Sequence, residues 1–260
     1  SIAPYVPALP GPQHTNEQEE TTQGAYFMLN FGLDDVAFDG NIGVRVVRTE
    51  NSAMGYVVFP NEIRAPYLGT GGSERVTAEN SYTDVLPSLN MRWEPITNVI
   101  FRFAASKAIA RPNFGDMQAY QVLDASVRDF DSAGNSCDGT LVVEVDCLSL
   151  SGSSYDNPYL EPMKANQFDL SAEWYFAPES GGMAWINFFY KDVKDYFRRQ
   201  TQLVAFPGAD GGSYDYLISR PVNVGEAKIR GAEVGWNQFF DFLPSPFDGF
   251  GMSANYTYID

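Results

Sequence analysis

The chain has little of several residue types on which common functions depend. It holds one histidine, two cysteines, and 17 Lys and Arg residues against 33 Asp and Glu residues in a total of 260. A single histidine, His14 in a polar leader, supplies neither a catalytic triad nor a metal cluster. The formal charge of -16 and the lack of a basic patch exclude a nucleic-acid-binding surface. No stretch approaches the roughly 20 consecutive apolar residues of a transmembrane helix, and residues 1–4 do not begin a signal peptide.

What the chain does have is alternation. In segment 167–176 one set of positions is apolar, namely Phe168, Leu170, Ala172, Trp174 and Phe176. A side-chain period of two predicts a strand with one apolar and one polar face. The same pattern predicts seven further strands, at 24–32, 41–49, 84–93, 98–109, 183–191, 232–237 and 251–258.

The connections between these strands alternate strictly between short and long. Short turns are expected at 33–39, 94–97, 177–181 and 241–248, and long segments at 50–81, 110–163 and 192–227. Strands of about ten residues with this asymmetry are typical of outer-membrane β-barrels, whose short turns are periplasmic and whose long loops are extracellular. A soluble β-sandwich would suit the composition, but not these strand lengths and loops.

Eight strands either close on themselves or leave two open edges. Open edges are not tolerated in lipid, because each unpaired backbone group costs several kcal/mol. We therefore interpret the chain as a section of a larger transmembrane antiparallel β-barrel. The alternative is a complete small barrel with very long loops.

Five segments have amino-acid sequences that are more specific than a simple alternation of apolar and polar residues. They are GNIGVRVVRTE at 40–50, YTDVLPSLN at 82–90, FRFAASKAIARP at 101–112, NPYLEP at 157–162 and IRGAEV at 229–234. In their order along the chain and in their sequences they resemble barrel segments of the TonB-dependent receptors. The likeness is greatest to the proteobacterial branch that is linked to the uptake of carbohydrates or other nutrients.

The resemblance implies properties that the periodicity does not show. Members have an N-terminal plug and a barrel of about 22 strands, lie in the Gram-negative outer membrane, and import scarce, bulky ligands through TonB. Residues 1–260 are then part of a single barrel domain, without the plug and the last strands. The expected partners are outer-membrane lipid and lipopolysaccharide, TonB through a plug outside this chain, and a small-molecule or oligosaccharide ligand. No cofactor is expected.

Two alternatives of a different class remain at this stage. A small closed barrel would have a structural or adhesive role, with its loops binding a surface partner. An outer-membrane hydrolase has less support, because no usable histidine or nucleophile motif is present, and the protein is not expected to be an enzyme. The ligand of a receptor stays open among a siderophore-bound iron, cobalamin, an oligosaccharide and a peptide.

The polar face supplies the candidate ligand contacts. If the long loops are extracellular, the upper lumen is lined by Ser106, Gln167, Asp169, Lys191, Glu233 and Thr257. We predict that these six residues contact the ligand. The alternative is a network of paired charges that holds the wall and the plug together. In the longest loop Tyr120, Tyr155 and Tyr159 either stack on a sugar ring or pack the loop.

Both cysteines, Cys137 and Cys147, lie in the longest loop. Export into an oxidising space predicts a disulfide between them. The nearby run of residues 129–134 opens like a calcium loop, but Ala133 and Thr140 break the EF-hand pattern, and no metal site is predicted. Irregular calcium binding by Asp129, Asp131 and Asp138 is the alternative to a solvated acidic loop.

Overall fold

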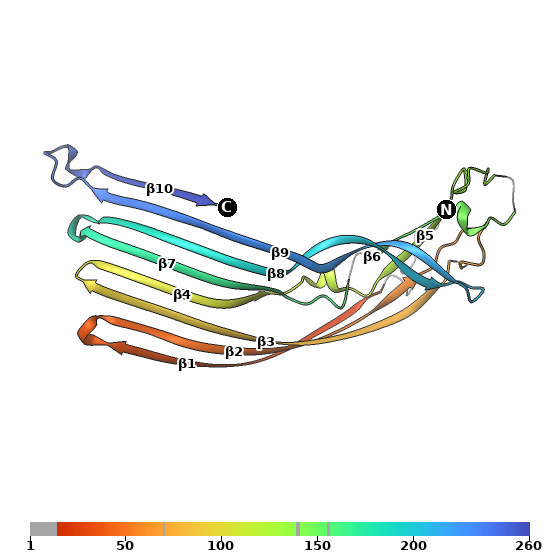
Figure 1. The fold of residues 1–260 in the computed structure, drawn as a ribbon, viewed down its shortest axis with the longest axis horizontal. Coiled ribbons are helices and arrows are strands. Elements are labelled where there is room, and N and C mark those ends of the chain that lie inside the picture. The colour runs from red at the N-terminus through yellow and green to blue at the C-terminus, as the bar shows by residue number, and fades with distance from the viewer. Residues whose placement is uncertain (1–14, 70, 139–140, 155–156) are drawn as a thin grey trace, which may run out of the picture.

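The computed structural model describes residues 15–69, 71–138, 141–154 and 157–260, and these residues are almost entirely strand (Figure 1). None of them forms a helix that is long and apolar enough to cross a membrane. The strands are β1 (Glu17–Leu33), β2 (Phe38–Val58), β3 (Ser73–Ile96), β4 (Val99–Ala110), β5 (Gln121–Val127), β6 (Leu148–Ser154), β7 (Met163–Ala177), β8 (Gly182–Pro207), β9 (Ser213–Phe239) and β10 (Gly251–Ile259).

Eight of these strands form one antiparallel wall in the order β1-β2-β3-β4-β7-β8-β9-β10. Their four short connections lie together at one end of the wall, here called the turn end, and the opposite end is called the loop end (Figure 1). Among the described residues β1 pairs only with β2, and β10 only with β9. The eight strands therefore do not close on themselves, and the small closed barrel is not what the chain forms.

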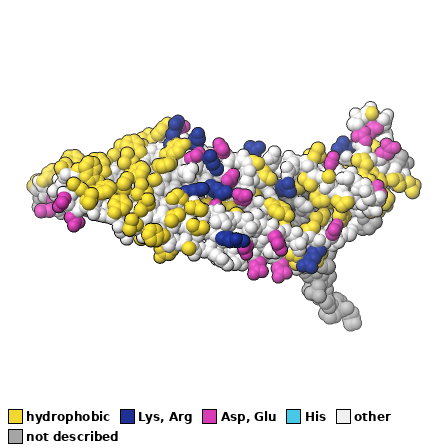
Figure 2. Space-filling view, turned by 60° about the horizontal axis from the view of Figure 1, so that its bottom comes forward, with side chains coloured by type: hydrophobic (Ala, Val, Ile, Leu, Met, Phe, Trp, Pro, Cys, Tyr) yellow, Lys and Arg dark blue, Asp and Glu magenta, His cyan; other side chains and the backbone are white. Residues whose placement is uncertain are grey.

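The two faces of the wall differ in chemistry. Along β7 the exposed positions are apolar, as at Phe168, Leu170 and Trp174, whereas Gln167 and Asp169 are half-buried. This is the reverse of a sheet on a soluble core. We call the face of Leu170 the outer face and the face of Asp169 the inner face. Figure 2 shows hydrophobic side chains covering the turn-end half of the molecule, with most charged side chains beyond it.

Two hairpins, β2–β3 and β8–β9, continue far beyond this apolar band toward the loop end (Figure 1). In β8–β9 a bulge adds one unpaired residue to each strand, Asp195 and Val224. An added residue reverses the alternation of faces. Even-numbered residues such as Val234 lie on the outer face below the bulge, whereas beyond it Tyr216 and Ile218 turn inward and are buried.

The hydrophobic core lies at the loop end. The β5–β6 hairpin pairs in parallel with both long hairpins. Gln121–Val122 of β5 pair with β2, and Ser151–Ser153 of β6 pair with β9. The buried cluster beneath it comprises Val57, Ala65, Leu68, Leu123, Val143, Leu148, Leu150, Tyr216 and Ile218. Burial of each large side chain contributes about 1.5–3 kcal/mol, so this cluster fixes the loop end as a packed unit.

The structure corrects the predicted strand lengths. Segments 50–81 and 192–227 were expected to be loops, but only 59–72 and 208–212 connect the strands there. The longest connection, 111–162, contains the additional hairpin β5–β6. The error has a physical cause, because beyond the lipid the outer face of a strand is no longer uniformly apolar, so the alternation that identifies the membrane part is interrupted.

Candidate functional site

All six predicted contact residues lie on the inner face, but at different heights. Ser106, Gln167 and Lys191 are direct neighbours across β4, β7 and β8 and form one row. Asp169 lies one row nearer the turn end, beside an inner groove of about 410 Å³ that Arg92 and Arg102 also line.

The other two predicted residues, Glu233 and Thr257, face each other across β9 and β10. Glu233 also pairs with Asn187, which places both residues in the row of Ser171, nearer the turn end than Asp169. The wall therefore brings three of the six together and separates the others along the lumen. Ligand contact by the six residues stays a prediction.

The inner face near the turn end carries paired charges. Arg102 Nε lies 2.8 Å from Glu173 Oε1, and the same carboxylate accepts a hydrogen bond of 2.9 Å from the Tyr175 hydroxyl. Arg92 bridges Asp39 at 3.2 Å and Glu94 at 2.5 Å. These cross-strand pairs suit the structural alternative for the polar face, a network that stiffens the wall.

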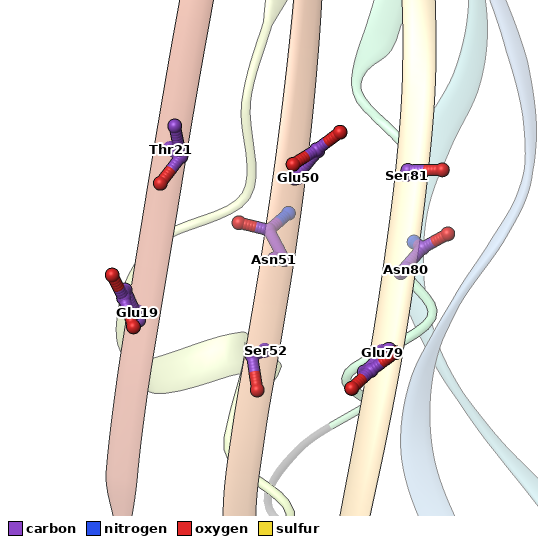
Figure 3. Close-up of a pocket in the computed structure, with 8 residues that line it drawn as sticks. All are labelled: Glu19, Thr21, Glu50, Asn51, Ser52, Glu79, Asn80 and Ser81. Atoms are coloured by element: carbon purple, nitrogen blue, oxygen red, sulfur yellow. The ribbon is translucent and has the colours of Figure 1, made fainter.

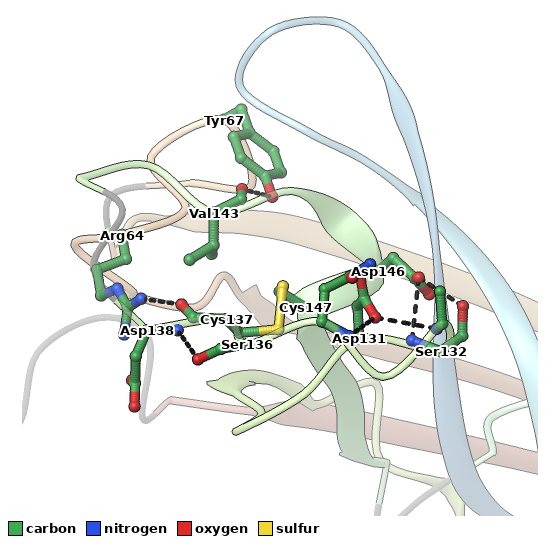
Figure 4. Close-up of a disulfide and its surroundings, with 12 residues drawn as sticks. Arg64, Tyr67, Asp131, Ser132, Ser136, Cys137, Asp138, Val143, Asp146 and Cys147 are labelled. Carbon is green, nitrogen blue, oxygen red and sulfur yellow. Dashed lines mark hydrogen bonds between the residues drawn. A yellow bond between two sulfur atoms is a disulfide. The ribbon is translucent and has the colours of Figure 1, made fainter.

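The disulfide Cys137–Cys147 is confirmed, and it ties the longest loop into the loop-end core (Figure 4). Cys137 is 1% exposed. Arg64 Nη2 donates a hydrogen bond of 2.6 Å to the Cys137 carbonyl, and the Tyr67 hydroxyl donates one of 2.7 Å to the Val143 carbonyl. The loop between β2 and β3 is thereby held against the disulfide loop.

The acidic residues of this loop are engaged in its own turns. Asp131 accepts hydrogen bonds from the Asn135 side chain and from the backbone N–H groups of Ala133 and Asn135, which hold the pKa of Asp131 below its usual value. Within the described residues no three His, Cys, Asp or Glu side chains are placed to hold a metal ion. His14 and Thr140 lie outside the described residues.

Two parts of the longest loop fold back over the inner face. The first, residues 111–120, is here called the strap, and it crosses β2 so closely that a Cβ atom on Gly55 would lie 2.0 Å from the Ala119 carbonyl oxygen. The second, residues 157–162, is called the return segment. Its Asn157 donates through Nδ2 to the Pro221 carbonyl at 3.0 Å and through its backbone N–H to the Asp116 carbonyl at 2.7 Å.

The strap and the return segment enclose a cavity of about 260 Å³ with the inner faces of β2, β3 and β9. We call this cavity the mouth pocket. Its lining is Val57, Val76, Thr77, Ala78, Gln118, Ala119, Tyr120, Gln121, Asn157, Pro158, Tyr159 and Arg220. Tyr159 is 60% exposed, so its ring is available to a ligand. Convergent aromatic and polar groups in a concave site are typical of ligand pockets.

Sequence reasoning found part of this pocket. Tyr120 and Tyr159 were named as residues that stack on a ligand or pack the loop, and Tyr155 lies outside the described residues. Arg220 and the amides at Gln118 and Gln121 were missed. No local signal marks them, because Arg220 lies beyond the bulge in a segment that was expected to be a loop.

A larger hollow lies on the opposite face of the same strands. This outer groove of about 640 Å³ is lined by Glu19, Thr21, Glu50, Asn51, Ser52, Glu79, Asn80 and Ser81 (Figure 3). Register places Glu19, Ser52 and Glu79 side by side across β1, β2 and β3. Because Glu19, Ser52 and Glu79 face away from the lumen, and only Asn51 and Asn80 of this lining occupy inward-facing positions, the mouth pocket and not the outer groove is the candidate ligand site.

Replacing Gly55 by valine is expected to displace the strap. The added carbon atoms would meet the backbone of Ala119, which cannot rotate away like a flexible side chain, and overpacking of this kind costs about 1–3 kcal/mol. Limited proteolysis should therefore cut the strap faster than in the unchanged receptor. Gly72→Val is the matched control, because a Cβ atom there would meet nothing within 4 Å. Equal cleavage of the strap in both variants would contradict the expectation.

The fold and the pocket together define a class of protein. It is a barrel wall with an apolar outer face and a polar inner face, whose longest loop folds inward over the lumen side. The family model for the TonB dependent receptor-like β-barrel matches residues 1–260, and the chain belongs to this family. The family is one of outer-membrane receptors, so the turn end is periplasmic and the loop end extracellular.

Solved structures agree with this fold. The chain is similar to a double mutant of the haemophore receptor HasR from Serratia marcescens in complex with HasA and haem, with a TM-score of 0.53 and 15% identity over 93% of this chain and 34% of that one. It is also similar to a mutant of the ferric enterobactin receptor PfeA from Pseudomonas aeruginosa in complex with enterobactin, with a TM-score of 0.51 and 16% identity over 95% and 36% of the two chains. The chain thus spans about a third of these receptors. A search of curated proteins found no match.

Proposed function

We propose that the protein is the wall section of an active transporter in the outer membrane of a Gram-negative bacterium, which imports a scarce nutrient such as a carbohydrate or siderophore-bound iron. The observation that carries the proposal is the mouth pocket, which the longest extracellular loop forms on the lumen side. Two receptors of similar fold are in complex with haem and its haemophore or with enterobactin. Such ligands are bulky and scarce, which supports import and not passive diffusion.

The rest of the receptor completes the transporter in this proposal. The free edges of β1 and β10 require further wall strands, because unpaired backbone groups are not tolerated in lipid. The apolar band contacts outer-membrane lipid, and the wall above it contacts lipopolysaccharide. A plug outside this section receives energy through TonB. The ligand is captured at the mouth, the wall stays rigid, and rearrangement of the plug opens the path.

An uptake comparison tests the proposal. Strains with and without the complete receptor gene take up labelled ferric siderophores, haem, cobalamin, oligosaccharides and peptides, each in the presence and absence of TonB. We expect one class of probe to depend on both genes. If deletion of the receptor leaves the uptake of every probe unchanged, import by this protein is contradicted.

Replacing Lys191 or Asp169 by alanine is expected to weaken ligand uptake if these inner-face residues contact the ligand on its way through the lumen. The loss of one charged hydrogen bond predicts a change of about tenfold in affinity. Lys194→Ala is the matched control, because Lys194 lies on the exposed outer face of the same strand. The measurement compares the ligand affinity of the purified complete receptor among the Lys191→Ala, Asp169→Ala and Lys194→Ala variants. Unchanged affinity in both inner-face variants would remove them from the site.

A further inference from the structure

The charge of the mouth pocket is opposite to that of the chain. Acidic residues outnumber basic ones by 33 to 17 in the sequence. Among the described residues Arg220 is nevertheless the one charged residue in the lining of the pocket, and no carboxylate of these residues lines it. A site with a guanidinium and without a carboxylate favours an anion.

The Arg220 side chain is braced for such a contact. With the Gln202 amide oriented so that its oxygen faces Arg220, that oxygen accepts hydrogen bonds of 2.6 Å from both Nε and Nη2. Among the described residues no acceptor is bonded to Nη1, and no carboxylate forms an ion pair with Arg220. A half-buried guanidinium held by a neutral amide is not paired with a carboxylate of the described residues and keeps Nη1 as a donor for a ligand.

The Gln118 amide adds a hydrogen-bond donor to the pocket. Its side-chain oxygen already accepts a hydrogen bond of 3.2 Å from Asn16, which leaves its NH₂ group to donate. Both polar ends of the Asn157 side chain are used within the return segment and its contact to Pro221. A guanidinium with an amide donor beside it suits a ligand that carries acceptor oxygens.

The rings at Tyr120 and Tyr159 add a stacking surface beside Arg220. The volume of about 260 Å³ lies near the lower end of ligand cavities, which are commonly about 300–1,000 Å³. The pocket therefore has room for one ring of a larger ligand. We propose that the mouth pocket is a subsite for an anionic ring, with Arg220 binding the acidic group and a tyrosine packing on the ring. This inference rests on the proposed import function, because it takes the lumen side as the ligand path.

A charge-matched pair of probes tests the subsite on the purified complete receptor. Glucuronate is compared with glucose, and benzoate with benzamide, so that each pair keeps its ring and differs in charge. Saturation-transfer NMR measures binding of each compound. We expect at least one acid to bind about tenfold more tightly than its neutral partner. Preference for glucuronate identifies a sugar acid, and preference for benzoate identifies an aromatic acid.

Variants assign the preference to a residue. Arg220→Gln should remove the preference for the acid and leave binding of the neutral partner unchanged. Arg75→Gln is the matched control, because Arg75 is an exposed residue of the loop-end part of β3 and does not line the pocket. Tyr159→Ala should weaken both members of a pair, whereas Tyr56→Ala, on a residue outside the pocket lining, should weaken neither.

Three outcomes would overturn the subsite: neutral partners that bind as tightly as the acids, an acid preference that survives in Arg220→Gln, or the absence of binding by both acids. Because these measurements need neither TonB nor transport, their failure leaves import standing. Failure of the uptake comparison removes import and leaves the measured acid preference unaffected.

Discussion

Replacing Leu170 by arginine is expected to destabilise the receptor in the membrane by about 2–4 kcal/mol. Leu170 lies on the outer face of β7, directly between Phe103 of β4 and Phe188 of β8. Its side chain is 49% exposed, so in a soluble sheet a charged residue at this position would cost little. The expected cost arises because in the proposed transporter this face meets hydrocarbon, where a guanidinium loses its hydration.

Leu203→Arg provides the control for this prediction. Leu203 is also an exposed leucine, at 65%, but it lies on β8 beyond the bulge and above the apolar band. We expect this variant to fold as the unchanged receptor does. Urea unfolding of the complete receptor in lipid vesicles compares the two arginine variants. The folded fraction at each urea concentration is measured by heat-modifiable gel mobility. Similar unfolding midpoints for both arginine variants would show that the band around Leu170 does not face lipid.

The membrane part of the wall could be predicted because lipid imposes a simple rule on sequence. In β7 every second side chain must be apolar, and the segment from Phe168 to Phe176 shows this directly. Beyond the band the rule ends. In β3 the outward residues Arg75, Thr77 and Glu79 are polar, and the pairing with β2 reveals this stretch as strand. Sequence reasoning therefore placed the eight wall strands correctly, made the long ones too short, and missed β5 and β6.

The candidate site shows the same division. Alternation was sufficient to place Gln167 and Lys191 on the inner face, because that face is a local property of a strand. The mouth pocket depends on a loop of 111–162 folding back across distant strands, which no local pattern encodes. Arg220 is the clearest case, because the one-residue bulge at Val224 decides which way it points. Tyrosines were easier to identify, since exposed rings in a loop already suggest a contact surface.

Removing the disulfide, through Cys137→Ala combined with Cys147→Ala, is expected to loosen the loop end and leave the wall intact. The bond closes a loop with a sequence separation of 10 residues, for which chain entropy predicts a loss of about 2–3 kcal/mol. The loss should be local, because the Cys137 and Val143 carbonyls are bonded to Arg64 and Tyr67 at the loop end, away from the apolar band.

Hydrogen exchange of the complete receptor measures both regions at once. Amides of β5 and β6 should exchange roughly 30- to 150-fold faster, since each 1.4 kcal/mol corresponds to a factor of about ten, whereas amides of β7 should keep their protection. Ser132→Ala serves as the control, because it removes a hydrogen bond of 2.5 Å to Asp146 in the same loop and leaves the disulfide in place. Its acceleration of exchange in β5 and β6 should be several-fold smaller, near the factor that corresponds to the free energy of one hydrogen bond.

If the double variant accelerates exchange in β7 as strongly as in β6, the loop end and the wall unfold as one unit. The mouth pocket could then not open without loss of the wall, and capture at the mouth above a rigid wall would have to be abandoned.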